Sequence, residues 1–371
     1  MGFFVNFPPS YYSMNKKKAK NKKASHRPQW LKKLLIAFGI IILLGAWGIW
    51  LTLGPATSFD GNEKAVYLYP ADCVPGKLEE KLKQEGVLTN PLMMKWLASP
   101  LNLWTKIRPG KYTIQRNQSL LQTLRMLRNN QQTEVRWVIK KVRTPEQFAG
   151  IVGKLFSTDS LTCLNFISSS DSLASYGVNS DQFMTLIFPD TYFFYWNTPI
   201  QRIIEKIAEQ RNNFWATGDR IALAAKKGLT PEQVYTLASI VEEETYNDAE
   251  KGKVASVYLN RLRKGMPLGA DPTIKFALRD FGLKRILHGH LQVASPYNTY
   301  RNKGLPPGPI CTPGKASIDA VLNAPETNYL FFVANSDFSQ NHIFTSNYQD
   351  HLKYAKQYQQ ALNNRYKNAT P

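Results

Sequence analysis

The longest apolar stretch of the chain comes early. Residues 34–53 form a run of twenty residues with no charged side chain. As a helix, such a run is about 30 Å long, which matches the hydrocarbon core of a bilayer. Trp30, Trp47 and Trp50 lie near its two ends, where aromatic rings favour the membrane interface. The pattern predicts a single transmembrane helix over 34–53.

Beyond a linker expected over 54–64, the period of the hydrophobic pattern changes several times up to residue 141. Alternating patterns predict three short strands, and apolar residues three or four apart predict helices between them. The strands are expected at 65–69, 110–114 and 135–139, and the helices at 77–84, 90–99 and 119–129. This order predicts a small α+β module over 65–141, closed by its third strand.

The remainder of the chain is mainly helical in pattern. Thr-Pro-Glu-Gln occurs at 144–147 and again at 230–233. Each copy predicts a helix start, with Thr as the N-cap and Pro at the first helical position. An aromatic run over 188–196 is typical of a core, although outside a cell it would also suit sugar stacking. The α+β fold is completed by a hairpin over 329–334 and 342–346 and by a helix over 348–365.

The helix that starts at residue 230 ends in three glutamates, Glu242, Glu243 and Glu244. Successive helical residues turn by about 100°, so Glu243 points away from the apolar face and is expected to be a solvated surface acid. Glu242 and Glu244 lie on the two flanks, where a carboxyl can be partly buried. Burial raises a carboxyl pKa toward the range that a general acid needs at neutral pH. A solvated helix face is the alternative for all three.

Loops with proline and polar side chains follow this helix. Asp271 begins another helix as Asp-Pro-Thr, and it is either the N-cap or a site residue. The stretch 297–310 holds three prolines and two glycines, and a stiff loop of this kind keeps polar side chains in fixed positions. Its Tyr297, Asn298 and Tyr300 offer ring faces and an amide, which suit a sugar with an N-acetyl group.

The distribution of charge predicts which end of the transmembrane helix faces the cytoplasm. The 371 residues include 47 Lys and Arg against 27 Asp and Glu, a net charge of +20. Nine of the basic residues and no acidic one lie in 1–33. The positive-inside rule therefore predicts a cytoplasmic tail over 1–33, a span in the inner (cytoplasmic) membrane, and an extracytoplasmic, periplasmic chain beyond it.

A nucleic-acid-binding tail and a cleaved signal peptide both account less well for this segment. A basic tail can bind nucleic acid, but its position beside the span already explains the charge, so no nucleic-acid partner is expected. A cleaved signal peptide fits poorly, because the apolar run is long and residues 56–58 make a poor cleavage site.

The residue content and the missing motifs exclude several classes of catalytic and binding site. Three cysteines cannot form a disulfide framework or a Cys-only zinc site, and the chain has no HExxH pair. It also has no GxSxG elbow and no GxGxxG loop after a strand. Residues 308–316 depart from a phosphate loop by one extra residue and by Ala316. Neither a metal nor a cofactor is therefore expected.

Seven short motifs follow one another in order between residues 237 and 334. The first, L-A-S-I-V-E-E-E-T at 237–245, is similar to the signature L-A-S-I-V-E-K-E-T. The others lie at 253–262, 270–273, 297–300, 304–310, 312–314 and 329–334. Together they resemble the endolytic murein transglycosylases, the MltG or YceG-like family. The family commonly reads L-E-G ahead of F-P-D-T-Y, whereas residues 183–187 read F-M-T-L-I here.

The resemblance implies a domain order and an activity. The expected domains are a LysM-like module over 65–141 and a catalytic domain over 142–371. The implied activity is a lyase reaction on peptidoglycan, which cleaves the bond between N-acetylmuramic acid and N-acetylglucosamine and leaves 1,6-anhydro ends. The implied partners are glycan strands, the membrane, and wall-building proteins such as penicillin-binding proteins and the division machinery.

The resemblance also implies roles for the candidate site residues. The family's catalytic acid corresponds to Glu242, which would protonate the leaving oxygen and then take a proton from the attacking C6 hydroxyl. The residues expected to bind or support the substrate are Glu244, Asp271, Tyr297, Asn298 and Tyr300. Two alternatives stay open, a non-enzymatic glycan-binding anchor and a lysozyme-like hydrolase.

Overall fold

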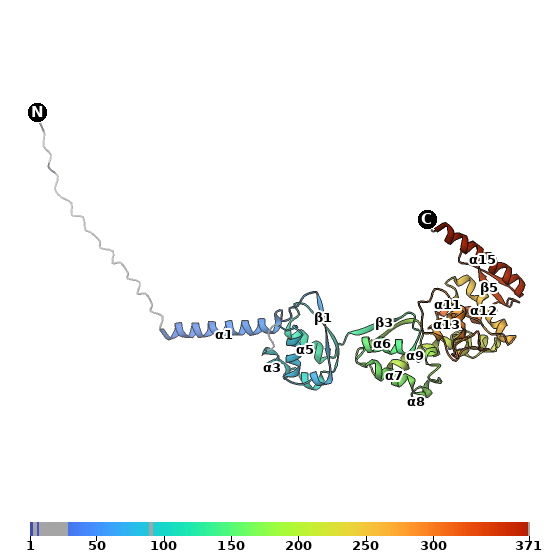
Figure 1. Ribbon diagram of the computed structural model, residues 1–371. Helices are drawn as coiled ribbons and strands as arrows, with labels where there is room; N and C mark the ends of the chain where they lie inside the picture. The colour runs from blue at the N-terminus through green and yellow to red at the C-terminus, as the bar shows by residue number, and fades with distance from the viewer. Residues whose placement is uncertain (3–5, 7–28, 89–91, 370–371) are drawn as a thin grey trace.

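A computed structural model describes residues 1–2, 6, 29–88 and 92–369. A long helix, α1 (Gln29–Leu53), leads into three folded units that follow one another in chain order, with the C-terminal helix at the far end (Figure 1). Each unit has its own buried hydrophobic core. The mixed α+β class is confirmed, and the sheets are three antiparallel pairs of strands within the described residues.

Helix α1 contains the apolar run that the sequence predicts to span a membrane. It starts five residues before that run, at Gln29, and its most apolar 18-residue window has a mean hydropathy of 2.5. None of its side chains is buried. By length and composition it is the one helix among the described residues that is able to cross a bilayer.

The first unit follows α1 directly. Strands β1 (Glu63–Leu68) and β2 (Gly110–Gln115) pair antiparallel, and short helices pack on them. These helices are α2 (Lys77–Gln84), α3 (Leu92–Ala98), α4 (Leu103–Lys106) and α5 (Leu120–Arg128). The strands and helices predicted here are thus confirmed, except that the start of the helix at 90–91 lies outside the described residues. The LysM-like character of the unit stays a prediction.

The expected linker over 54–64 is partly packed against the first unit. The Thr57 side chain is buried, and its hydroxyl donates to the Gln115 carbonyl at 2.8 Å. The Asn117 amide donates in turn to the Thr57 carbonyl. Gly, Pro and Ser mark a break in regular structure, but they do not prevent the backbone from bonding to a neighbouring turn.

The third predicted strand, β3 (Glu134–Ile139), forms where expected but does not close the first unit. It pairs antiparallel with β4 (Asp190–Tyr195), over fifty residues away, and the prediction of a closing strand is therefore wrong. Alternation identifies a strand but carries no information on its partner. Helices α6 (Pro145–Leu155), α7 (Ser160–Ser168), α8 (Ser170–Leu173) and α9 (Ile200–Ala216) complete this middle unit.

The aromatic run becomes β4 and the residues beside it. Tyr192, Phe194 and Trp196 are buried in the middle core, whereas Phe193 and Tyr195 on the other face are exposed. The prediction of core residues is therefore confirmed for one face of the strand. Period-two alternation explains the division, because successive side chains of a strand point to opposite faces.

The last unit is mainly helical. Its helices are α10 (Arg220–Lys226), α11 (Pro231–Glu244), α12 (Asp248–Arg263), α13 (Asp271–Ala277), α14 (Lys315–Leu322) and α15 (Tyr348–Ala369). Strands β5 (Phe331–Ala334) and β6 (His342–Thr345) form the predicted hairpin, and α15 packs against it. Helix α11 lies at the centre, with eight successive buried residues from Val234 to Val241. It carries the three glutamates at its end.

Candidate active site

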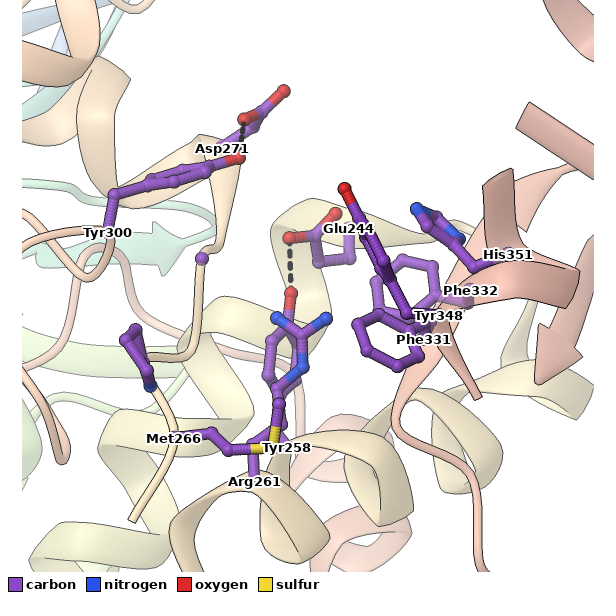
Figure 2. A pocket seen from close by; sticks show the side chains of 12 residues that line it. Glu244, Tyr258, Arg261, Met266, Asp271, Tyr300, Phe331, Phe332, Tyr348 and His351 are labelled. Carbon is purple, nitrogen blue, oxygen red and sulfur yellow. Dashed lines mark hydrogen bonds between the residues drawn. The ribbon is translucent and has the colours of Figure 1, made fainter. Parts of the chain in front are cut away.

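A cavity of about 540 Å³ opens in the last unit, at the end of α11. It is lined by Glu244, Tyr258, Arg261, Met266, Pro267, Gly269, Asp271, Tyr300, Phe331, Phe332, Tyr348 and His351. Figure 2 shows Glu244 between the Tyr300–Asp271 pair on one side and the rings of Phe331, Tyr348 and His351 on the other. Of the six residues predicted for the site, the structure thus brings three together here, Glu244, Asp271 and Tyr300.

Helix α11 places Glu244 in the cavity. Its N-terminus is fixed by a capping box, because the Thr230 hydroxyl accepts from the Gln233 amide and the Gln233 side chain accepts from the Thr230 amide. Its C-terminus falls at Glu244, since Thr245 adopts an extended conformation. The last residue of a buried helix therefore directs its side chain into the space beyond the helix end.

The carboxyl of Glu244 is tuned to hold a proton near neutrality. Burial is the main cause that raises its pKa, to about 7, and the charge of Asp271 acts in the same direction. The hydrogen bond from the Tyr258 hydroxyl, 2.6 Å long, acts the other way. Arg261 and Lys275 also favour the carboxylate. The balance gives a group that can both donate and accept a proton at neutral pH.

Helix α12 contributes Tyr258 and Arg261, one turn apart on the same face. Burial and the neighbouring Glu244 both raise the pKa of Tyr258, so its hydroxyl keeps its proton and donates to Glu244. The Arg261 guanidinium donates to the Leu330 carbonyl at 2.7 Å and to the Leu268 carbonyl at 2.5 Å. These two bonds hold the cation beside the cavity and tie α12 to the hairpin.

Asp271 faces Tyr300 rather than capping its own helix. The N-cap of α13 is Ala270, and no side chain caps that helix end. The Tyr300 hydroxyl donates to the Asp271 carboxylate at 2.5 Å, and both residues are exposed at the cavity. The N-cap alternative is therefore wrong. Because the proline occupies the second helical position, Asp271 is itself the first residue of the helix. Its carboxylate is therefore not used as the cap.

Tyr297 and Asn298 stabilise the loop that carries Tyr300. Asn298 is fully buried, and its amide donates to the carbonyls of Leu291 and Val293 while its oxygen accepts from the Tyr300 amide. The Tyr297 ring packs on Phe276, with ring centroids 4.5 Å apart. Neither residue lines the cavity. Asn298 therefore acts on the site by fixing the backbone that carries Tyr300.

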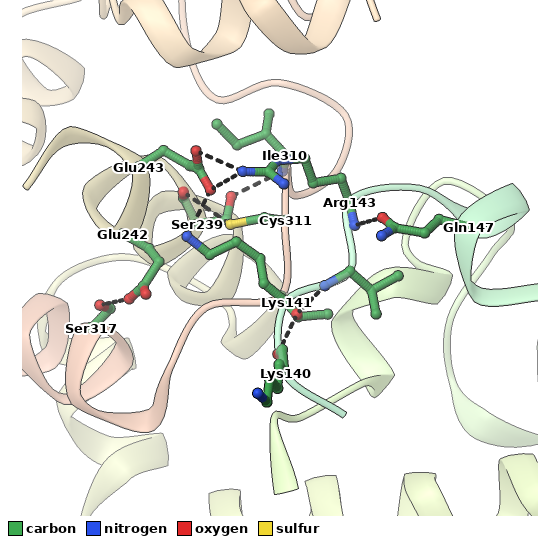
Figure 3. A network of polar contacts seen from close by, with 12 residues as sticks. Lys140, Lys141, Arg143, Gln147, Ser239, Glu242, Glu243, Ile310, Cys311 and Ser317 are labelled. Atoms are coloured by element: carbon green, nitrogen blue, oxygen red, sulfur yellow. Dashed lines mark hydrogen bonds and ion pairs between the residues drawn. The ribbon is translucent and has the colours of Figure 1, made fainter. Parts of the chain in front are cut away.

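Glu242 lies outside this cavity. Its carboxylate accepts from the Ser317 hydroxyl (Figure 3), and it also pairs with Lys251 at 3.3 Å. Ser317 is fully buried, and the Lys251 side chain is 8% exposed. Because the partners come from α14 and α12, Glu242 joins three helices of the core. Such an arrangement is suited to a brace between helices, and it keeps the carboxylate out of the cavity lining.

Glu243 is not the solvated surface acid expected from the helical count, and that prediction is wrong. Its carboxylate pairs with Lys141 at 2.9 Å and with Arg143 at 3.2 Å (Figure 3). Burial opposes the charge, but the hydrogen bond and charge of Lys141, with those of Arg143, outweigh it and lower the pKa of Glu243. The helical count failed because the connection after β3 covers the face that it left to solvent.

Comparison with known proteins identifies the family. The family model described as the YceG-like family matches residues 73–357, most of the chain. The chain belongs to the YceG-like family.

The YceG-like relatives include two curated proteins named endolytic murein transglycosylase. The one from Bacillus subtilis is 38% identical over 175 residues, which cover 46% of this chain and 47% of the relative. The one from Streptococcus pneumoniae D39 is 25% identical over 359 residues, which cover 88% of this chain and 64% of the relative. The chain thus matches between about half and two thirds of the length of these relatives.

A solved structure is similar as well. The crystal structure of a Listeria monocytogenes protein described as yceG-like has 25% sequence identity and a TM-score of 0.52. The similarity covers 79% of this chain and 99% of that protein. The YceG-like architecture therefore extends over most of the chain described above.

Sequence reasoning predicts only three of the twelve residues that line the cavity in this YceG-like chain. It singles out neither Tyr258 nor Arg261 as a site residue. Their spacing of three residues on a helix that follows the glutamates is a usable signal. No local signal points to Tyr348 or His351, because they reach the cavity from α15, about one hundred residues after Glu244.

Proposed function

We propose that this chain is a membrane-anchored endolytic lytic transglycosylase that cleaves peptidoglycan glycan strands, with Glu244 as its general acid and base. The observation that carries the proposal is the Glu244 carboxyl, which lines a 540 Å³ cavity and whose pKa burial raises to about 7. The names of the curated relatives support the substrate and the reaction type. The proposal exchanges the roles that the sequence suggested for Glu242 and Glu244.

In the first half of the reaction, Glu244 acts as an acid. At neutral pH a large fraction of its carboxyl is protonated, so it can transfer that proton to the glycosidic oxygen as the bond to C1 of the muramic sugar breaks. The positive charge that develops at C1 is stabilised by the sugar's own 2-acetamido group. The Asp271 carboxylate, held by Tyr300 at 2.5 Å, adds negative charge on that side of the cavity.

In the second half, Glu244 acts as a base. The new carboxylate is stabilised by the Tyr258 hydroxyl at 2.6 Å and by the nearby charges of Arg261 and Lys275. It takes the proton from the C6 hydroxyl, whose oxygen forms the new bond to C1 and closes the 1,6-anhydro ring. One C–O bond breaks and one forms, the proton returns to Glu244, and no water is consumed.

A lysozyme-like hydrolase is the second candidate, because two carboxyls line the cavity. Hydrolytic glycosidases use such a pair, one as acid and the other as nucleophile or base. Asp271 would then activate water or attack C1 directly, and the products would carry reducing ends. The Tyr300 hydroxyl already donates to one oxygen of Asp271, so that oxygen is less available to activate water or attack C1, which favours the transglycosylase.

The membrane anchor belongs to the same proposal. Helix α1 is long and apolar enough to cross a bilayer, and the basic residues of 1–33 would keep the N-terminus cytoplasmic. The three folded units would then lie on the outer side of the membrane, where peptidoglycan is found.

The deciding experiment is mass spectrometry of glycan products from the full-length protein and two matched variants. We expect the wild type to release 1,6-anhydro ends and Glu244→Gln to lose about 10²–10⁴-fold in rate while staying folded. Glu242→Gln should keep the chemistry but lose roughly 1–3 kcal/mol of stability, because it removes one of the two carboxylate partners of the buried Lys251.

Three results would contradict parts of the proposal. Reducing ends in place of anhydro ends would favour the hydrolase. Normal rates in Glu244→Gln, with a folded but inactive Glu242→Gln, would return the acid role to Glu242. Binding of glycan without any cleavage by the wild type would indicate a non-enzymatic anchor.

A further inference from the structure

Helix α15 brings two side chains to the cavity that the proposed chemistry does not use. Tyr348 and His351 lie one turn apart at its start and line the cavity together with Phe331 of β5. The His351 ring stacks on Phe331, with centroids 5.3 Å apart and an interplanar angle of 25°, and the Tyr348 ring lies 5.5 Å from Phe331. We refer to Phe331, Tyr348 and His351 as the aromatic wall; it faces Glu244 in Figure 2.

Tyr348 is too exposed to be explained as an anchor for the helix. Its relative exposure is 58%, although its ring touches both Phe331 and His351. A ring that only fastened α15 to the hairpin would be expected to be buried, because burial is the source of its stabilisation. An exposed ring at the edge of a cavity instead offers an apolar face to a ligand.

His351 has an unmet hydrogen-bonding capacity. Its Nδ1 is buried, and neither ring nitrogen has a hydrogen-bond partner among the described residues. Buried polar atoms are usually bonded, and an exception commonly marks a ligand site. Burial and the nearby Arg261 charge lower the pKa of His351, so the ring is neutral at pH 7 and can donate or accept.

His342 of the neighbouring hairpin shows what a structural role for a histidine looks like. His342 Nδ1 lies 2.9 Å from a Glu250 carboxylate oxygen, and the other oxygen of Glu250 accepts from the His342 amide at 2.9 Å. Its Nδ1 and its backbone amide are thus both paired with one carboxylate of the protein. The contrast with His351 supports a ligand as the missing partner of the latter.

We propose that the aromatic wall is a binding subsite for one N-acetylated hexosamine residue of the substrate glycan, contributed by the C-terminal helix. The apolar face of the pyranose lies against the Tyr348 ring, and a sugar hydroxyl or acetamido group bonds to His351. This inference rests on the proposed function for the identity of the glycan. It makes Tyr348 and His351 binding residues, distinct from the acid–base role of Glu244.

Binding measured without turnover tests the subsite. The probe is a peptide-free peptidoglycan glycan oligosaccharide, titrated into the full-length protein carrying Glu244→Gln and followed by calorimetry. We expect Tyr348→Ala and His351→Phe each to weaken binding about tenfold, the usual effect of one lost hydrogen bond or stacking contact. His351→Gln keeps a polar side chain and should retain most of the affinity.

The matched control is Gln349→Ala, in the same helical turn but exposed and absent from the cavity lining. It should bind as the parent protein does. Melting temperatures of all variants should agree within a few degrees, which separates lost contacts from lost folding. In the active protein, His351→Phe should raise KM about tenfold and change kcat by less than about threefold.

The outcomes separate this inference from the proposed function. Cleavage by the wild type with unchanged KM and affinity in Tyr348→Ala and His351→Phe would overturn the subsite and leave the activity standing. Binding weakened by both variants, without cleavage by the wild type, would overturn the activity and support the subsite. No glycan binding by the parent protein would overturn both.

Discussion

Three consecutive residues of α11 carry the same functional group into three different environments. Glu242 pairs with a buried lysine, Glu243 with two cations from the connection after β3, and Glu244 with a tyrosine hydroxyl inside a cavity. Helical geometry alone separates their directions by about 100° per residue. What surrounds each direction comes from other parts of the chain, and it decides which partners each carboxyl meets.

The raised pKa of Glu244 predicts a stability gain when its charge is removed. The folded state holds the proton up to about pH 7, whereas the unfolded chain releases it near 4.5. The contribution of Glu244 to the free energy of unfolding is therefore fully present below about pH 4.5 and is lost as the pH rises through 7. Glu244→Gln should raise the melting temperature at pH 8, through a gain on the order of 1–3 kcal/mol, with the gap closing at pH 4.5. Equal melting temperatures at pH 8 would contradict the raised pKa.

The lowered pKa of Glu243 predicts the opposite pH dependence of the free energy of unfolding. Lys141 and Arg143 lower its pKa in the folded state, so the stability that the ion pairs supply is present above the unfolded pKa and is lost as the pH falls through the folded value. Glu243→Gln should cost about 1–2 kcal/mol at pH 7 and almost nothing at pH 3. Urea unfolding at both pH values measures this, and a pH-independent cost would refute the assignment.

At the scale of helices and strands, local sequence signals predict where each element lies but not which distant element it pairs or packs with. The capping residues Thr144 and Thr230 predict two helix starts, and both hydroxyls accept from the amide three residues on. By contrast, nothing in the pattern of β3 indicates β4 as its partner, and nothing in α15 indicates the cavity. Caps and periodicity depend on neighbouring residues, whereas pairing and cavity lining depend on contacts between distant segments.

Two glycines lie in the loop that joins α12 to α13, and they allow the effect of this loop on the cavity to be measured. Gly265 and Gly269 both have positive φ, at 62° and 58°. A Cβ at 265 would meet no atom within 4 Å, whereas one at 269 would lie 3.2 Å from the Arg261 guanidinium and 3.7 Å from the Tyr300 ring. Each Gly→Ala substitution should cost about 1–2 kcal/mol from backbone strain.

Only Gly269→Ala should also lower kcat/KM, by about tenfold or more, since it alone displaces cavity residues. Gly265→Ala is the matched control for backbone strain. Steady-state release of glycan products, corrected for the folded fraction of each variant, gives the comparison. Equal loss of activity in the two variants would show that the loop has no direct effect on the cavity.

On the scale of the whole molecule, α1 and the cavity lie at opposite ends of the row of folded units (Figure 1). None of the side chains of α1 is buried in any of the three cores. The helix can therefore be altered without disturbing the cavity. Anchoring and catalysis are expected to be separable properties of one chain.

Charges placed in the middle of α1 test this separation. Ile41 and Leu43 are 65% and 71% exposed, and an arginine at the centre of a span costs about 2.5–3.5 kcal/mol of insertion free energy. We expect the wild type to stay in the pellet after alkaline carbonate extraction of membranes, and Ile41→Arg/Leu43→Arg to move to the supernatant. The released protein should keep its melting temperature and its rate on soluble glycan strands, because no core residue has changed. Carbonate extraction of the wild type itself would argue against a spanning α1, whereas a parallel loss of activity in the variant would show that the cavity depends on the anchor.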